Sequence, residues 1–365
     1  FKKSQIYQQK ATLKDAKEQT VREKYVLIEN TLASSRNTLS VTYLCESAGV
    51  SRSGYYAYIR NKNDPDSYLN QKELQDQKDF DLILEAYNHR GYKKGRRGIR
   101  MRLLHTGIIM NEKKISRLMN KFHLLCPIRK ANPYRRMMKA MKTSNVAQNL
   151  LERNFEDYGP GYVLLTDITY LFFSRRRIKA YLSVVKDAFT KQILSYVISL
   201  SLEEDFVLET IELLFAHHKM DIHTDALIHS DQGAHYTSYK FIELLKSKEI
   251  RQSMSRKGNC WDNAPQESFF GHMKDELGDL KNVESFEELK TIIDDYMDYY
   301  NKERYQYELA KLSPNEYAEY YKTGIYPLKE VIEEPIQFIE KFKRVRNNVD
   351  YFSSTEDISA KSSSS

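Results

Sequence analysis

Residues 226–238, ALIHSDQGAHYTS, place a dense group of polar side chains directly behind a short apolar run. Ala226, Leu227 and Ile228 have the composition of a buried strand. The residues that follow include two histidines, an aspartate, a glycine and several hydroxyl side chains, whereas buried strands more often end in simple turn residues. The pattern indicates that Asp231 is held rigidly at the tip of a strand.

The segments on both sides of this stretch predict an α/β fold. Three β-rich runs separated by short polar turns predict an antiparallel meander: GYVLLTDITYLFF (161–173), IKAYLSVVKDA (178–188) and KQILSYVIS (191–199). An amphipathic helix over 202–218, the strand ALIHS, a helix over 238–248, the strand IRQSMS and a long helix from about Pro265 follow. This βββαβαβα order is that of the ribonuclease H-like fold, whose mixed sheet places the first and fourth strands side by side and parallel.

That topology predicts a site made of acids. Asp167 lies in the first strand and Asp231 follows the fourth, so the two carboxylates should converge. Two buried acids without a basic partner are costly, and a divalent cation such as Mg²⁺ relieves that cost. Glu267, in the first turn of the helix from Pro265, is the expected third ligand, and Asp262 in the preceding turn competes with it. Three such acids around two metal ions would form a phosphoryl-transfer site.

Phe270 and Lys274 share the helical face of Glu267 and predict an aromatic wedge and a phosphate-binding ammonium beside the acids. The alternative without a catalytic role is that the three acids are a helix cap, a turn residue and a surface acid. His217, His218 and His223 do not have the spacing of a zinc site.

Positive charge is concentrated in one segment. Residues 90–145 contain 17 Lys and Arg against one acid, so this segment carries +16 and the rest of the chain −9, for a total of +7. Such a concentration indicates a polyanion as partner, most simply nucleic acid, although a solubilising helical face is the alternative. Asn111 should cap a helix with an apolar stripe, and we expect the basic side chains of this segment to contact phosphates, namely Arg96, Arg97, Arg100, Lys113, Lys114, Arg117 and Lys121.

Residues 40–59, SVTYLCESAGVSRSGYYAYI, predict a helix-turn-helix. Gly49 supplies the turn and Ser51 caps the second helix, which would present Arg52, Ser53 and Tyr56 to a DNA groove. A generic helical hairpin is the alternative.

The three cysteines, Cys45, Cys126 and Cys260, are far apart and form no CxxC pair, which predicts a reducing compartment. The sequence has no stretch of membrane-spanning length and no signal-like start, so we expect a cytoplasmic, nucleoid-associated protein.

Three stretches resemble the conserved blocks of the DDE transposases of bacterial insertion sequences: LLTDITYL, HSDQGAHYTS and SMSRKGNCWDNAPQESFFGHMKDEL. More closely, they resemble the second-frame product of the two-reading-frame group, whose core is similar to retroviral integrase. The 35 residues between Asp231 and Glu267 match that group's spacing, and YYNKERYQYELAKLSPNEY (299–317) resembles its closing block, with Asn301 and Arg304 as expected DNA contacts. The likeness covers roughly residues 20–320.

The resemblance implies that Asp167, Asp231 and Glu267 hold two Mg²⁺ ions, for which Mn²⁺ can substitute. Water would cut the strand at the element's end to leave a 3′-hydroxyl, which then attacks a second phosphodiester. Family members act as homo-oligomers on paired element ends and target DNA, and the full product is a fusion with a first-frame segment. The chain departs from the pattern at Leu164 and Leu165, where an aromatic residue is usual, and at Tyr305 and Gln306, where a histidine is usual.

Three alternatives follow from the same residues. A catalytically inactive DNA-binding regulator would not need three acids, a structure-specific nuclease would not need the helix-turn-helix, and a tyrosine recombinase would need an Arg/His/Arg set that the sequence lacks. The predicted organisation is a helical segment (1–35), a helix-turn-helix (36–62), a basic helical unit and connector (70–145), the catalytic core (150–325) and a partly disordered tail (326–365).

Overall fold

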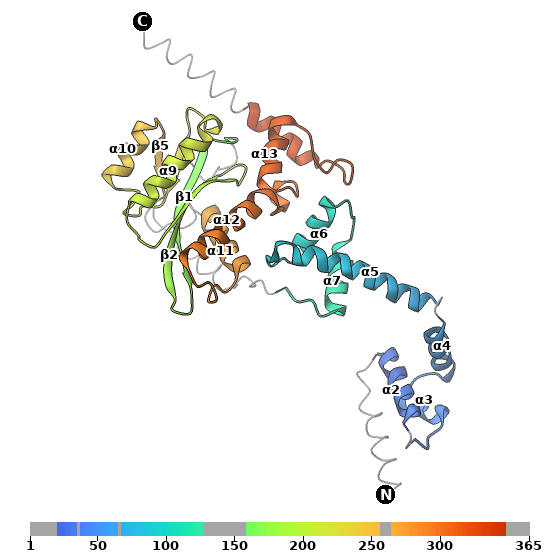
Figure 1. Ribbon diagram of the computed structural model, residues 1–365. Helices are drawn as coiled ribbons and strands as arrows, with labels where there is room; N and C mark the ends of the chain where they lie inside the picture. The colour runs from blue at the N-terminus through green and yellow to red at the C-terminus, as the bar shows by residue number, and fades with distance from the viewer. Residues whose placement is uncertain (1–19, 35–36, 65–66, 127–157, 256–263, 348–365) are drawn as a thin grey trace, which may run out of the picture. The chain divides into compact units, whose positions relative to one another are not determined.

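The computed structural model describes residues 20–34, 37–64, 67–126, 158–255 and 264–347 (Figure 1). The chain divides into two compact units, residues 1–81 and 82–365. The predictions for residues 1–19, the connector 127–145, Asp262 and residues 348–365 lie outside the described residues. Within the described part of the chain, no helix has the combination of length and apolar composition that crossing a membrane requires.

The first unit contains the predicted helix-turn-helix. Helices α2 (Val21–Ala33), α3 (Val41–Ala48) and α4 (Arg52–Asn63) pack around Ile28, Leu44, Cys45, Ala48 and Tyr55. Gly49 takes the left-handed conformation, with φ of 67°, that lets the chain turn after α3. The Ser51 hydroxyl accepts a hydrogen bond from the Gly54 N–H and caps α4. Sequence and structure therefore agree on this motif.

A second helical pair begins the larger unit. Helix α5 (Tyr68–Asn88) crosses the boundary between the units, and it is followed by η2 (His89–Gly91), α6 (Arg96–His105) and α7 (Glu112–Lys121). The Asn111 side chain accepts a hydrogen bond from the Lys113 N–H, as expected for the cap of α7. Ile115, Leu118 and Met119 are buried on the apolar face of α7.

The sheet has the predicted topology. Its five strands are β1 (Val163–Phe173), β2 (Ile178–Asp187), β3 (Ile193–Ser199), β4 (Leu227–Ser230) and β5 (Arg251–Met254), in the spatial order β3-β2-β1-β4-β5. The first three strands are antiparallel, whereas β1, β4 and β5 run parallel. This mixed sheet, with its meander followed by two crossovers, is the ribonuclease H-like arrangement.

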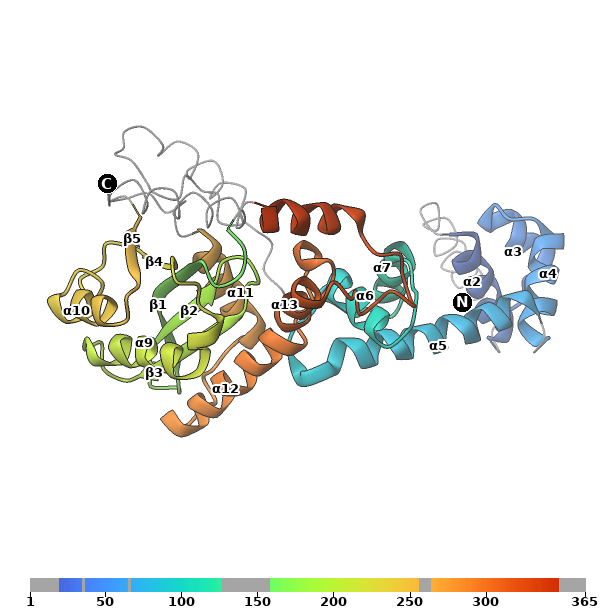
Figure 2. The same ribbon diagram turned by 90° about the horizontal axis from the view of Figure 1, so that it is seen from above.

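Helices cover both faces of the sheet (Figures 1 and 2). On one face α9 (Asp205–His218) and α10 (Tyr239–Ser247) enclose Val185, Ile211 and Ile228. On the other face α11 (Ala264–Leu277) and α12 (Phe286–Lys302) enclose Leu182, Val184 and Met273. The alternation of Val184 and Val185 between the two cores follows from the two-residue period of a strand. The short helices η3 (Lys219–Asp221) and η4 (Tyr307–Leu309) complete the connections.

The packed core extends beyond the predicted boundary at residue 325. Helix α13 (Pro314–Thr323) and a helix over residues 336–347 form a third apolar cluster with Phe189 at the β2–β3 turn. Phe338, Phe342 and Val345 are buried in that cluster at helical spacing. Residues 326–347 are therefore part of the folded unit, which corrects their assignment to a tail.

Gly161 supports the start of β1 and provides a test of the fold. It has a φ of +76°, its N–H donates to Asp187 Oδ2 at 2.7 Å, and its carbonyl accepts the His223 N–H. A Cβ atom at this position would lie 2.1 Å from the Asp221 carbonyl oxygen.

We expect Gly161→Ala to lower the free energy of unfolding by about 3 kcal/mol, because left-handed backbone strain adds to a clash with a backbone atom. The matched control is Gly324→Ala, where φ is +73° but no atom lies within 4 Å of the added Cβ. It should cost about 1 kcal/mol. Denaturant unfolding followed by circular dichroism measures both, and equal losses would contradict this account.

Candidate active site

The pairing of β1 with β4 determines where the first two acids lie. Val163 is level with Leu227, and Leu165 with His229. If this register continues for two more residues, Asp167 stands level with Asp231. Adjacent strands are about 4.8 Å apart, and residues two apart on a strand share a face. The structure therefore brings the two predicted carboxylates together at the carboxyl end of β4.

The loop after β4 is organised around Asp231. The Asp231 Oδ1 atom accepts the Gly233 N–H at 2.9 Å, and the Ser238 hydroxyl caps α10 by accepting the Phe241 N–H. Tyr236 is buried between these points, and its pKa is held well above the usual range by burial and by the charge of Asp167. The polar residues of the opening stretch thus hold an aspartate on a short, braced turn.

Asp167, the first of the three predicted acids, has a pKa that is shifted by its surroundings. Its pKa is raised to about 7, first by burial and then by the negative charges of Asp231 and Glu267. The Ile168 N–H, which donates to Asp167 Oδ1 at 2.8 Å, and the ammonium of Lys274 act in the opposite direction. The charges of Asp231, Glu267 and Lys274 therefore all act on the Asp167 carboxyl.

Glu267 lies in the first turn of α11, as predicted, and is exposed. Lys274, two turns further on, lies with its Nζ atom 4.8 Å from the centre of the Tyr170 ring. Phe270 is buried in the core beneath α11, so it is not the exposed aromatic wedge that the helical spacing predicts.

The carboxylate oxygens of these acids are the kind of ligand that a hard divalent cation prefers. No salt bridge within the described ranges involves Asp167 or Asp231, so a cation would offset the repulsion between their charges. The described residues nevertheless contain no group of three His, Cys, Asp or Glu side chains already arranged to hold a metal ion. The structure therefore brings the acids into one neighbourhood without arranging them as a closed site.

Two of the helices expose the predicted DNA-contacting side chains. On α4, Arg52, Ser53 and Tyr56 are exposed, and the Arg52 guanidinium lies 5.7 Å from the Tyr56 ring centre. On α7 the basic residues line the face opposite the apolar stripe, with Lys113, Arg117 and Lys121 exposed and Lys114 half-buried. Both helices therefore present the surfaces that their patterns predict.

The arginines of α6 are partly used within the protein. Arg96 and Arg100 lie 3.6 and 3.7 Å from the Glu112 carboxylate, and Arg100 donates to the Tyr307 hydroxyl at 2.9 Å. Arg97 is exposed and lies 5.6 Å from the Tyr307 ring centre. The Arg100 guanidinium thus contacts α7 and η4, and phosphate contacts of the three arginines stay a prediction.

Asn301 and Arg304 also have internal roles. The Asn301 amide exchanges two hydrogen bonds with the backbone of Ile193, at 2.8 and 2.9 Å, and fixes α12 to β3. Arg304 forms a bidentate salt bridge with Glu276, in which the two side chains are only 17% and 8% exposed. These contacts give both side chains a role in holding the core together, and their contact with DNA stays a prediction.

A set of basic residues that the sequence reasoning missed fastens the second helical pair to α12. Arg90 pairs with Asp295, Asp298 and Glu303 at 2.8, 3.1 and 2.6 Å, and Arg102 lies 3.5 Å from Glu303. The acids of α12 were visible in the sequence, but their partners lie about two hundred residues away. Part of the basic excess therefore neutralises acids of the protein itself.

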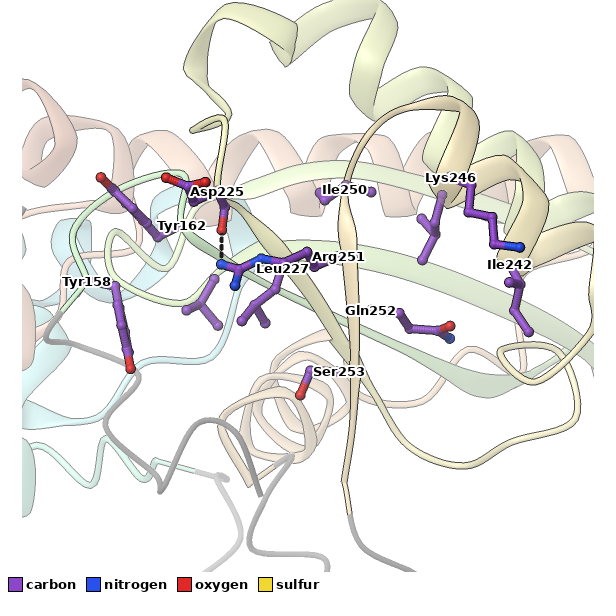
Figure 3. Close-up of a pocket in the computed structure, with 12 residues that line it drawn as sticks. Tyr158, Tyr162, Asp225, Leu227, Ile242, Lys246, Ile250, Arg251, Gln252 and Ser253 are labelled. Atoms are coloured by element: carbon purple, nitrogen blue, oxygen red, sulfur yellow. Dashed lines mark hydrogen bonds between the residues drawn. The ribbon is translucent and has the colours of Figure 1, made fainter. Parts of the chain in front are cut away.

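A cavity of about 560 Å³ lies at the opposite end of the parallel strands (Figure 3). It is bounded by Val163, Leu227 and Arg251, the first residues of β1, β4 and β5. Arg251 donates to the Asp225 carbonyl there. Because the acids follow the carboxyl end of β4, this cavity does not belong to the candidate active site.

Three family models match parts of the chain. Two models described as "Integrase core domain" match residues 139–260 and 267–320, and one described as "HTH-like domain" matches residues 74–132. The last match covers α6 and α7 rather than α3 and α4. The sequence signal for this helix-turn-helix is a glycine, Gly107, followed by the helix-capping residue Asn111. In the structure Gly107 has a φ of 77° and Asn111 caps α7.

Curated relatives cover most of the chain. It is 34% identical over 276 residues to InsK of insertion sequence element IS150 from Escherichia coli (strain K12), which is 75% of this chain and 92% of InsK. It is 32% identical over 232 residues to the transposase for insertion sequence element IS904 from Lactococcus lactis subsp. lactis (strain IL1403), 62% of this chain and 89% of that protein.

Among solved structures, the catalytic core domain of HTLV-2 integrase in complex with magnesium is 18% identical, with a TM-score of 0.34 over 44% of this chain and 97% of that one. The strand order, and not this partial overlap, carries the fold assignment.

The salt bridge between Arg304 and Glu276 makes a testable distinction between an internal role and a DNA contact. Arg304→Ala leaves the Glu276 charge buried and unpaired, so we expect it to lower the free energy of unfolding by about 3–5 kcal/mol. Replacing both residues, as in Arg304→Met with Glu276→Leu, should recover much of that loss. Denaturant unfolding of the full chain measures this, and a loss below about 1 kcal/mol for Arg304→Ala would contradict the structural role of the salt bridge.

Proposed function

The chain belongs to the integrase-core transposases of insertion sequences, and we propose that it cuts and joins DNA strands at the ends of such an element by metal-dependent phosphoryl transfer. The observation that carries the proposal is the parallel pairing of β1, which contains Asp167, with β4, which Asp231 follows directly; the charges of Asp231 and Glu267 both act on the Asp167 carboxyl. We further propose that the protein works as a homo-oligomer on paired ends and stays bound to cellular DNA.

The three carboxylates are the proposed ligands of two Mg²⁺ ions, with Mn²⁺ able to substitute. Bound there, the cations would lower the pKa of an attacking hydroxyl and stabilise the oxygen that leaves phosphorus. Asp167 and Asp231 are anchored by a strand and a braced turn, so they would orient these ligands. Lys274, on the face of α11 that carries Glu267, would bind a non-bridging phosphate oxygen of the strand to be cut.

The reaction proceeds in two successive nucleophilic displacements at phosphorus. In the first, a water oxygen forms a bond to phosphorus, the bond to the 3′-oxygen breaks, and that oxygen takes up a proton to become a 3′-hydroxyl. In the second, this hydroxyl forms a bond to a phosphorus of target DNA, loses its proton, and a target 3′-oxygen leaves. Neither step needs a covalent bond between protein and DNA.

Two regions of the protein are proposed to bind DNA in different ways. The exposed basic face of α7, within the HTH-like match, would contact phosphates, whereas the exposed residues of α4 would contact base edges. The helix-turn-helix around α4 would then recognise the element's end while α7 contributes affinity on any sequence.

We expect Asp167→Asn, Asp231→Asn and Glu267→Gln each to reduce strand cleavage in Mg²⁺ by at least about a thousandfold, because each removes one metal ligand. DNA binding should remain, and in metal-free buffer the thermal stability should not fall, because a source of charge repulsion has been removed. Asp279→Asn, which changes an exposed acid paired with Lys281, is the control. Cleavage of labelled end duplexes is the measurement, and near-normal activity in any one of the three variants would show that residue not to be a ligand.

We expect replacement of Lys113, Lys114 and Arg117 by alanine to weaken binding to all duplexes and to flatten the dependence of affinity on salt by about two to three logarithmic units per decade. Arg52→Ala should instead reduce the preference for the element's end over scrambled duplex, by about 1–3 kcal/mol. Competition binding over a range of salt concentrations distinguishes the two effects. If both variants change only overall affinity, base recognition does not reside in α4.

A further inference from the structure

A second cavity, of about 710 Å³, lies between α6, the beginning of α11 and the end of α12, all within the larger unit. Its size is within the range of ligand sites in proteins. Seven lysine and arginine side chains line it, against three glutamates. Such an excess of positive charge in a concave site favours an anionic ligand.

Two of the glutamates are already committed to arginines. Glu276 holds Arg304 and accepts the Tyr296 hydroxyl at 3.0 Å. Glu303 holds Arg90, with an oxygen-to-nitrogen distance of 2.6 Å, and also lies near Arg102. The remaining positive charge of the cavity is therefore not balanced by these acids.

Lys186 on β2 is the most deeply placed cation of the cavity. It is 3% exposed, and within the described part of the chain its Nζ atom donates one hydrogen bond, to the Pro265 carbonyl at 2.9 Å. Burial, followed by the positive charges of Lys191 and Arg304, lowers the pKa of Lys186 to about 7. An ammonium has three donors, so a ligand oxygen can still be bound.

Lys94, which precedes α6, is the second buried cation. It is 6% exposed, and its Nζ atom donates to the carbonyls of His89 and Tyr92, the latter at 2.9 Å. Burial lowers its pKa to about 8. A bound anion would stabilise the charged form of both side chains, which burial disfavours.

We propose that this cavity binds a phosphate group of the DNA backbone through Lys186 and Lys94. The inference rests on the proposed function, because DNA is the polyanion that such a protein must hold. The cavity joins the HTH-like helices to the first turn of α11, where Lys186 bonds the carbonyl of Pro265 two residues before Glu267. A strand that passes from α7 toward the acids would therefore be fixed here, close to the helix that carries the third acid.

The test compares Lys186→Met with Lys329→Met, which removes the same charge from an exposed position outside the cavity. Anisotropy of a labelled 30-base-pair duplex should show about tenfold weaker binding for Lys186→Met at low salt, and a salt slope smaller by about one. The control should match the wild type. If Lys186→Met does not fold, as judged by circular dichroism, Lys94→Met replaces it in the same assay.

Unchanged affinity and slope in a folded Lys186→Met or Lys94→Met variant would overturn the proposal. Thermal shift with pyrophosphate and with a mononucleotide identifies the source of the phosphate. Stabilisation by these small ligands that depends on Lys186, with duplex binding unaffected, would overturn the assignment to DNA. Cleavage by Asp231→Asn is measured in parallel: if cleavage is lost there while Lys186→Met binds DNA normally, the proposed function stands and only this inference fails.

Discussion

Two hydrogen-bonded strands that run in the same direction, β1 and β4, place Asp167 two residues beyond the last residue of β1 that pairs with β4 and Asp231 directly after β4, although 63 residues separate the two aspartates in the sequence. Every other feature of the site depends on that pairing. The turn after β4 braces Asp231, α11 brings Glu267 and Lys274 to the same place, and burial of Asp167 raises its pKa. Burial and the neighbouring negative charges disfavour the charged form of Asp167, and we propose that a divalent cation bound there stabilises it.

Some basic residues bind acids of the protein and others are proposed to bind DNA, and a count of charges does not distinguish the two groups. Arg90, Arg100 and Arg304 are held by acids or a phenol of the protein, so they join elements that are distant in sequence. The basic face of α7 is largely exposed, and Lys94 and Lys186 are buried; we propose that both regions bind phosphates of DNA. A buried cation without an acid is a stronger indication of a phosphate site than an exposed one, because its desolvation must be compensated.

Local patterns sufficed for much of the fold, whereas the role of the three acids stays a prediction. Strand order followed from two-residue and helical periodicities, and the caps at Ser51 and Asn111 followed from single residues. Contacts between residues far apart in the sequence could not be predicted. Nothing in the sequence indicates that Asn301 bonds to Ile193 or that Arg304 pairs with Glu276. The helix over residues 336–347 has an apolar spacing, Phe338, Phe342 and Val345, that is typical of an amphipathic helix. Its burial depends on Phe189, which is distant in the sequence.

The central claim is that Asp167 and Asp231 share a divalent cation at the carboxyl end of β4. Anomalous diffraction from a crystal of the full chain soaked in Mn²⁺ tests it most directly, because the signal locates the metal independently of any activity. The account predicts a peak in coordination contact with a carboxylate oxygen of both aspartates, with Glu267 turned toward the same site. Saturating Mn²⁺ that gives no peak there, or a peak that contacts neither aspartate, would contradict it.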